Sequence, residues 1–329
     1  MENVVEIRDL HFSYEKRKIL NGINLRIPQG KTVAVLGTGG CGKSTLLRLI
    51  SGQLKPERGQ VLVDGEDVHA LDNDGLYRLR RKMGVMFQVS GLFSDLSVFE
   101  NIAFPMREHT DLPERMIRDL VLMKLHAVGL RGAHGMMPRE LSGGMERRVA
   151  LARAIALDPM LIMYDEPFAG LDPISLNVIA NLLRRLNDAL GVSSIVVTYD
   201  VSESLKVVDY VYFLSEGVIV AEGSTREILA SEDPFVKQFI HAEPDGPVHF
   251  HYPAKPLRRD LGLARAESQA GAEHAQIRRP CSIGLAGAAG VRPGRAPCQC
   301  ADIPEWLQGF GGRGSPGQPR ACLGSAHRL

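Results

Sequence analysis

The stretch TVAVLGTGGCGKSTLLRLI, residues 32–50, decides the fold. Its first five residues are apolar or β-branched and lie between Gly30 and Gly37, a pattern typical of a buried parallel strand. The segment from Gly37 to Ser44 has the form G-x-x-x-x-G-K-[ST], and a helical pattern follows it as far as Ile50. In such a strand–loop–helix unit, backbone N–H groups and the helix N-terminus hold phosphate groups. The stretch therefore predicts an α/β nucleotide-binding core.

Roles within this loop follow from the chemistry of each residue type. The Lys43 ammonium is expected to reach the β- and γ-phosphates, and the Ser44 hydroxyl to ligate Mg²⁺. A glycine-rich turn without a ligand is the alternative, and the flanking strand and helix argue against it. The residues expected to contact ATP are Gly37, Thr38, Gly39, Gly40, Cys41, Gly42, Lys43, Ser44 and Thr45.

A pair of acidic residues follows another apolar run, Leu161–Tyr164. The C-terminal ends of strands in an α/β sheet are where ligands bind, which places Asp165 and Glu166 at the site. Asp165 is expected to hold Mg²⁺ through water, and Glu166 to act as general base toward the attacking water. Alone, an Asp-Glu pair is usually the solvated start of a helix, but the phosphate-binding loop upstream favours the catalytic interpretation.

A second phosphate-binding helix start lies between these two motifs. Leu141-Ser-Gly-Gly-Met145 precedes a helical pattern, so Ser142 and the N–H groups of Gly143 and Gly144 can contact phosphate. One γ-phosphate cannot easily use both helix starts of one chain, which implies a second copy. In these motifs the chain resembles the ABC transporter ATPases over residues 4–240 or so. The resemblance implies an ATP-hydrolysing dimer that drives a separate membrane permease.

The resemblance assigns roles to further residues. Tyr14 matches the aromatic residue that stacks on adenine, and a half-buried strand tyrosine is the alternative. Gln88, directly after a predicted strand, matches the glutamine that senses Mg²⁺ and adjoins the permease-facing subdomain. Asp172 matches the end of a loop that crosses the dimer interface, an interpretation compatible with a helix N-cap before Pro173.

Tyr199 departs from the family pattern. It follows the predicted strand Ser194–Thr198, where the family has a histidine that contacts the γ-phosphate. A phenol donates a hydrogen bond but carries no positive charge at neutral pH. The predicted catalytic set is Glu166, Gln88 and Tyr199, and a weakly active regulatory ABC subunit is an alternative function.

Several segments narrow the resemblance to the ATPases of Mla-type phospholipid transporters (MlaF-like). They are Phe87–Phe93, Phe104–Thr110, Met123–Gly132, Glu140–Arg148 and Asp245–Pro253. This resemblance implies phospholipid transport between the inner and outer membranes, which maintains outer-membrane lipid asymmetry. The implied partners are an MlaE-like permease, an MCE-domain lipid-binding protein and a small STAS-domain protein, at the cytoplasmic face of the bacterial inner membrane. Another ABC importer or exporter is the alternative.

Composition limits the remaining function classes. The chain has 329 residues, is 44% hydrophobic and carries a formal charge of +1, which argues against nucleic-acid binding. ABC ATPases of translation carry two cassettes, and those of DNA repair insert a long coiled coil between the motifs; neither pattern is present. No apolar run is long enough to span a bilayer, and the start lacks a secretion-signal pattern, so we expect an intracellular protein.

The predicted fold is a P-loop NTPase core with a mostly parallel sheet, an antiparallel β subdomain and a helical subdomain carrying the Leu-Ser-Gly-Gly motif. Residues 1–242 are expected to form the nucleotide-binding domain, and residues 243–256 an extension that resembles the family. Residues 257–329 are rich in glycine and arginine, lack lysine and show no apolar period, which predicts disorder and suggests out-of-frame coding. The cysteines there match no standard zinc pattern: Cys281, Cys298, Cys300 and Cys322.

Overall fold

The computed structural model describes residues 2–248, together with residues 257 and 261. The elements below all belong to the first of two units into which the chain divides, Met1–Lys255. The predictions for the tail, including its four cysteines, lie outside the described residues. The predicted boundary at residue 242 stays a prediction.

A six-stranded sheet forms the centre of the fold, in the order β10-β9-β3-β8-β7-β6. Every neighbouring pair is parallel except β10 and β9. All five residues of β3 are buried, as the apolar run before the glycine-rich loop predicts. The mostly parallel sheet is thereby confirmed. Its strands are β3 (Thr32–Leu36), β6 (Met83–Met86), β7 (Leu161–Asp165), β8 (Ser193–Thr198), β9 (Tyr210–Ser215) and β10 (Val218–Ser224).

The predicted antiparallel layer is a separate four-stranded sheet, in the order β2-β1-β4-β5. Its strands are β1 (Asn3–Tyr14), β2 (Arg17–Pro28), β4 (Arg58–Val63) and β5 (Glu66–Asp67). The turn between β4 and β5 consists of Asp64 and Gly65, with φ of 53° and 76°. Asp-Gly is a preferred pair for a hairpin turn that needs positive φ at both positions, which explains why the chain turns here.

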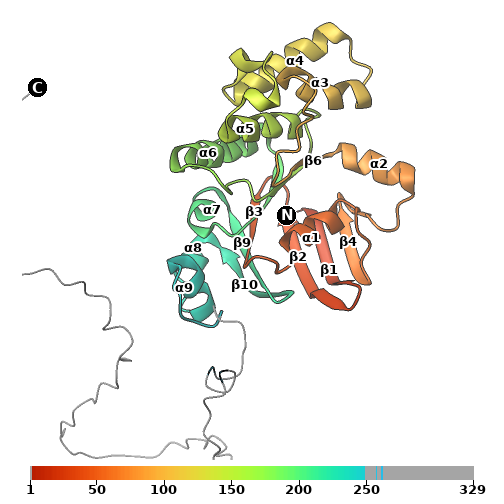
Figure 1. The fold of residues 1–329 in the computed structure, drawn as a ribbon. Coiled ribbons are helices and arrows are strands. Elements are labelled where there is room, and N and C mark those ends of the chain that lie inside the picture. The colour runs from red at the N-terminus through yellow and green to blue at the C-terminus, as the bar shows by residue number, and fades with distance from the viewer. Residues whose placement is uncertain (1, 249–256, 258–260, 262–329) are drawn as a thin grey trace, which may run out of the picture. The chain divides into compact units, whose positions relative to one another are not determined.

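Helices cover the central sheet and extend beyond it. The helix α1 (Lys43–Ile50) directly follows the glycine-rich loop, and α2 (Asn73–Arg81) packs near β6. The helical subdomain contains α3 (Val98–His109), α4 (Glu114–Ala127), two 3₁₀ turns (Arg131–Ala133 and Pro138–Glu140) and α5 (Gly143–Ala154). Figure 1 shows α3 and α4 beyond β6, at the opposite end from β1 and β2. The remaining helices are α6 (Pro173–Leu190), α7 (Val201–Val207), α8 (Thr225–Leu229) and α9 (Pro234–His241).

Two hydrophobic cores lie on the two faces of the central sheet. Because side chains alternate along a strand, Val33 and Val35 of β3 enter one core, while Ala34 and Leu36 enter the other. The first core is shared with α1 and the antiparallel sheet, and the second with α5, α6 and the helical subdomain. Within the described residues, no helix is both long and apolar enough to cross a bilayer.

Candidate functional site

The glycine-rich loop between β3 and α1 is shaped by close backbone contacts. A Cβ atom on Gly37 would lie 2.1 Å from the Leu214 carbonyl oxygen, so a larger residue cannot occupy this position. Gly42 has φ of 111° and begins α1 without a side-chain cap. The first N–H groups of α1 therefore remain available to phosphate oxygens. The Cys41 side chain is buried in the core beneath the loop, which leaves only its backbone to face a ligand.

The Lys43 ammonium lies within this loop. Nζ donates to the Gly37 carbonyl at 2.9 Å and to the Thr38 carbonyl at 3.0 Å. Nζ is also 3.6 Å from Glu166 Oε1, and both side chains are buried. Two motifs that are far apart in sequence thus meet as an ion pair at the C-terminal edge of the sheet.

Ser44 and Asp165 form the second link between α1 and β7. The Ser44 hydroxyl donates to Asp165 Oδ1 at 2.9 Å. Burial raises the pKa of Asp165, and the hydrogen bond from Ser44 partly offsets this effect. This partly buried carboxylate lacks full compensation from its protein neighbours, so it favours a bound cation.

The backbone of Glu166 is held in the left-handed region, with φ of 48°. Its N–H donates to the Val197 carbonyl at 2.8 Å, and its Oε2 accepts from the Tyr199 N–H at 3.2 Å. The Glu166 side chain is only 8% exposed. Glu166 thus has one carboxylate oxygen toward Lys43 and the other bound to the backbone after β8, which orients the carboxylate.

A cavity of about 500 Å³ is lined by Lys43, Ser44 and Glu166. Asp165 does not line it, but faces a smaller hollow that also includes Ser44. The larger cavity brings together the loop and α1 start with Tyr14, Gln88, Glu166 and Tyr199, residues that come from five separate parts of the chain. Tyr14 and Tyr199 are 41% and 54% exposed, so both rings are accessible from solvent. The predicted residues that line the cavity are Tyr14, Gly39, Gly40, Gly42, Lys43, Ser44, Thr45, Gln88, Glu166 and Tyr199.

Two lining residues were missed at the sequence level: Arg17 and Ile19 of β2. Arg17 pairs directly with Tyr14 across the β1–β2 hairpin. Once Tyr14 is assigned to the nucleotide base, its partner across the hairpin is the signal that would have identified Arg17. Pairing gives no such signal for Ile19.

The structure does not bring Ser142, Gly143, Gly144 or Asp172 to this cavity. Ser142 instead caps α5, where its hydroxyl accepts from the Met145 N–H at 3.3 Å. Asp172 caps α6 and accepts two N–H groups at 3.0 Å each, which confirms the predicted N-cap. Neither helix start therefore contributes to the cavity of its own chain.

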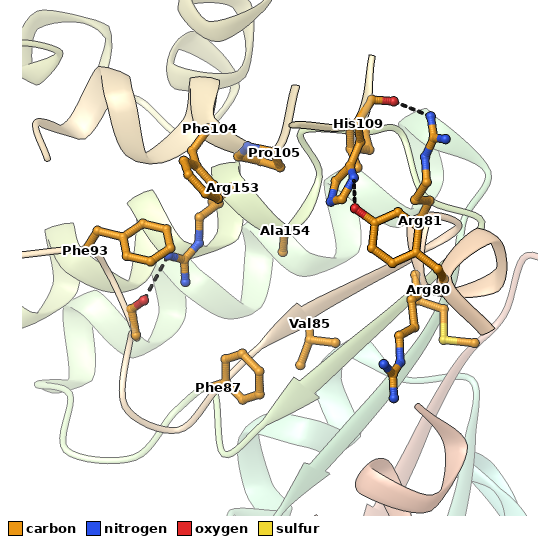
Figure 2. A pocket seen from close by; sticks show the side chains of 14 residues that line it. Arg80, Arg81, Val85, Phe87, Phe93, Phe104, Pro105, His109, Arg153 and Ala154 are labelled. Atoms are coloured by element: carbon orange, nitrogen blue, oxygen red, sulfur yellow. Dashed lines mark hydrogen bonds between the residues drawn. The ribbon is translucent and has the colours of Figure 1, made fainter. Parts of the chain in front are cut away.

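A second hollow, of about 490 Å³, lies between the central sheet and the helical subdomain. Figure 2 shows Phe93 and Phe104 on one side of this groove, with Arg81 and His109 on the other. The rings of Phe93 and Phe104 are 4.9 Å apart, and each is more than two-fifths exposed. The Arg153 guanidinium lies 5.6 Å from the Phe93 ring centroid and donates to the Gly91 carbonyl at 2.8 Å.

Comparison with known proteins identifies the class of this fold and site. The family model described as "ABC transporter" matches residues 20–169. A dimeric ATP-binding cassette, solved in a post-hydrolysis state with ADP and Pi, has a TM-score of 0.62 and 31% identity. That match covers 68% of this chain and 99% of the cassette. The chain is therefore an ATP-binding cassette that binds and hydrolyses ATP.

Curated relatives define the family more narrowly. The intermembrane phospholipid transport system ATP-binding protein MlaF of Haemophilus influenzae is 54% identical over 260 residues, or 79% of this chain and 98% of that protein. The MlaF protein of Escherichia coli K12 is 50% identical over 259 residues, covering 79% and 96%. The chain belongs to this MlaF family of ABC transporter ATPases.

Proposed function

We propose that this chain powers phospholipid transport between two membranes as the ATP-hydrolysing subunit of an ABC transporter. The observation that carries the proposal is 54% identity over 98% of an MlaF protein, combined with a cavity that gathers the residues for ATP hydrolysis. In this assignment Lys43 binds the β- and γ-phosphates, Tyr14 stacks on adenine, and Glu166 accepts a proton from the attacking water. The direct test is reconstitution with its permease in lipid vesicles, where phospholipid transfer should require both ATP and an intact Glu166.

The working unit in this proposal is a dimer of two identical chains. Ser142, Gly143 and Gly144 lie outside the cavity of their own chain, so they are suited to close the cavity of a second copy. The helix that starts at Gly143 has twelve residues and its N-terminal donors can face the γ-phosphate of that copy. Asp172 begins α6 beside this helix start, since a Cβ on Gly144 would lie 2.9 Å from Ser175 Oγ.

The oxygen atoms of Ser44, Asp165 and Gln88 fit Mg²⁺. They are hard donors, and Mg²⁺ at phosphate sites uses few protein ligands together with waters and phosphate oxygens. Among the described residues no group of three or more His, Cys, Asp or Glu could hold a metal alone, in keeping with such a shared site. Bound Mg²⁺ would offset charge on the β- and γ-phosphates, while Ser44 and Asp165 hold its position.

Asp165→Asn should lower the affinity for Mg²⁺ without lowering the stability of the protein. Burial raises the pKa of Asp165, so its ionised form opposes folding, and an amide of the same shape removes that charge. We expect the Tm without ATP to equal or exceed that of the parent, while the Mg²⁺ affinity of the ATP complex falls about 10–100-fold. Mg²⁺ titration of ATPase activity measures this, with the exposed Asp119→Asn as control. An unchanged Mg²⁺ dependence would remove Asp165 from the metal site.

The permease is proposed to dock in the groove described above. Its lining combines aromatic side chains with the guanidinium groups of Arg80, Arg81 and Arg153, and none of its described lining residues is Asp or Glu. These arginines donate to backbone carbonyls of Ser51, Gly52, His109, Ser90 and Gly91. The complementary partner is a helix with an apolar face and at least one carboxylate. In this proposal the partner helix belongs to an MlaE-like permease, which would hold the chain at the cytoplasmic face of the inner membrane. By resemblance, an MCE-domain lipid-binding protein and a small STAS-domain protein complete the complex.

Phe104→Ala should weaken this docking. Truncating an exposed aromatic anchor at the centre of an interface costs about 2 kcal/mol, or roughly 30-fold in affinity. We expect loss of co-purification with the permease while ATP affinity stays at the parent value, since Phe104 does not line the ATP cavity. Leu229→Ala, which truncates another exposed apolar side chain, on α8, is the control. Full retention of the permease by Phe104→Ala would exclude the groove as its docking site.

A weakly active regulatory subunit is the second candidate function, and the observation that favours it is Tyr199. This residue lines the cavity where the family has a histidine. The ATPase rate, measured with and without the permease and lipid, distinguishes an active motor from a regulatory subunit. The rate of a regulatory subunit should not rise when the permease and lipid are added.

A further inference from the structure

Glu166 keeps its left-handed backbone only because its surroundings hold it there. The φ angle of Glu166 is 48°, a value that non-glycine residues seldom adopt. Such conformations persist where neighbouring groups fix them. The Glu166 N–H is bound to β8, and its carboxylate is bound to Lys43 and the Tyr199 N–H. The remaining backbone group of Glu166 is its carbonyl oxygen.

That carbonyl accepts a hydrogen bond from Arg147. Nη1 of Arg147 donates to the Glu166 oxygen at 3.1 Å, and Nη2 donates to the Ala169 oxygen. The Ala169 N–H also donates to the Glu166 oxygen at 3.3 Å. One planar guanidinium therefore spans both ends of the short turn that carries the catalytic carboxylate, a geometry that a single ammonium cannot reproduce.

The surroundings of Arg147 indicate that these two contacts are its main role. Burial lowers the pKa of Arg147, and in the described part of the chain its guanidinium forms no ion pair within 4.0 Å. A partly buried cation without a carboxylate partner is costly unless its donors are satisfied. Here the backbone carbonyls of the 166–169 turn satisfy them.

Arg147 also connects this turn to α5, a helix that contacts the segment after Gln88. It lies on α5, which starts at the Ser142 cap. Toward the other end of α5, Arg153 donates to the Ser90 and Gly91 carbonyls at the groove. In the first turn of α5, Glu146 accepts from the Ser90 hydroxyl at 3.2 Å. Through α5, the segment after Gln88 and the catalytic turn share one rigid element.

We propose that Arg147 is a positioning residue for ATP hydrolysis: its guanidinium fixes the turn between Glu166 and Ala169 to α5 and thereby aims the Glu166 carboxylate. The inference rests on the proposed role of Glu166 as general base. Arg147 does not line the ATP cavity, so it acts on the reaction through Glu166 and not through the nucleotide.

Steady-state kinetics of Arg147→Gln and Arg147→Lys test the role. Misplacing a catalytic group by about 1 Å can cost ~10²-fold in rate, so we expect kcat of Arg147→Gln to fall between 10- and 100-fold. The KM for ATP should stay within about 3-fold, because ATP binding does not use Arg147. Arg147→Lys should recover part of kcat, since one ammonium can bind one of the two carbonyls. The control is Arg118→Gln, which removes an exposed guanidinium on α4.

A double mutant separates positioning from a merely structural effect. In the Glu166→Gln background, Arg147→Gln should cause no further loss of kcat, because residues that act as a unit are not additive. An additive loss, a raised KM or a parent-like kcat in both Arg147 variants overturns the positioning role. If Glu166→Gln itself keeps parent turnover, the base assignment fails and the inference with it; if only Arg147→Gln keeps it, the inference alone fails.

Discussion

Glu166→Gln should lower ATP turnover by about 10²–10⁴-fold, the range that general-base catalysis contributes. Glutamine preserves the shape of the side chain and can still contact Lys43 and the Tyr199 N–H, but its amide cannot accept a proton from water. ATP binding uses the loop and the start of α1, which this substitution leaves in place. The variant should therefore bind ATP without completing the reaction.

The same variant tests the dimer. If two copies close over ATP, hydrolysis is what opens them, so Glu166→Gln with ATP and Mg²⁺ should elute as a dimer in size exclusion. Without nucleotide it should elute mainly as a monomer. Glu57→Gln removes an exposed carboxylate and should behave as the parent protein does. Parent-like turnover in Glu166→Gln would falsify its role as the base.

Tyr199→His should raise the rate of ATP hydrolysis, by roughly 10-fold or more. The transition state of phosphoryl transfer spreads charge over the equatorial oxygens, and loss of one preorganised donor typically costs about 10²–10³-fold. Imidazole is shorter than phenol and can carry positive charge near neutral pH. The backbone N–H of residue 199 already binds Glu166, and this bond does not depend on the side chain. The substitution therefore reports on the side chain alone.

Tyr199→Phe completes the series. It keeps the ring and removes the hydroxyl, so turnover should fall below that of the parent while ATP affinity stays within about 3-fold. Single-turnover hydrolysis of all three forms, assembled with the permease, separates chemistry from product release. Equal rates for Tyr199→Phe and the parent would mean that the hydroxyl has no catalytic part and that the ring only packs at the cavity edge.

The local units of the fold were predictable from the sequence. β3, the loop and α1 are adjacent in the chain, so spacing and residue type specify their geometry without long-range contacts. The same holds for the Asp64–Gly65 hairpin and for α4, where the buried Ile117, Val121 and Leu125 recur at helical spacing. The resemblance also led to the MlaF family, which the curated relatives confirm.

The cavity could be predicted only in part. Lys43 and Glu166 were assigned separate roles, and their 3.6 Å ion pair arises because β3 and β7 flank β8 in the sheet. Arg17 reaches the cavity through its pairing with Tyr14 in the hairpin. These contacts depend on which strands lie side by side, and strand order is set by packing of the whole core and not by any one segment.

The sequence by itself determined the class of chemistry, because phosphate cradling, Mg²⁺ ligation and proton acceptance each require a residue type at a local spacing. Tertiary structure alone decided how those groups are aimed. The hydrogen bonds of Arg147 join α5 to the left-handed turn that follows β7. The groove lies between β6 and the helical subdomain. The physical reason is distance along the chain: local geometry follows from backbone and side-chain preferences, whereas these contacts exist only after two separate cores have packed on the two faces of one sheet.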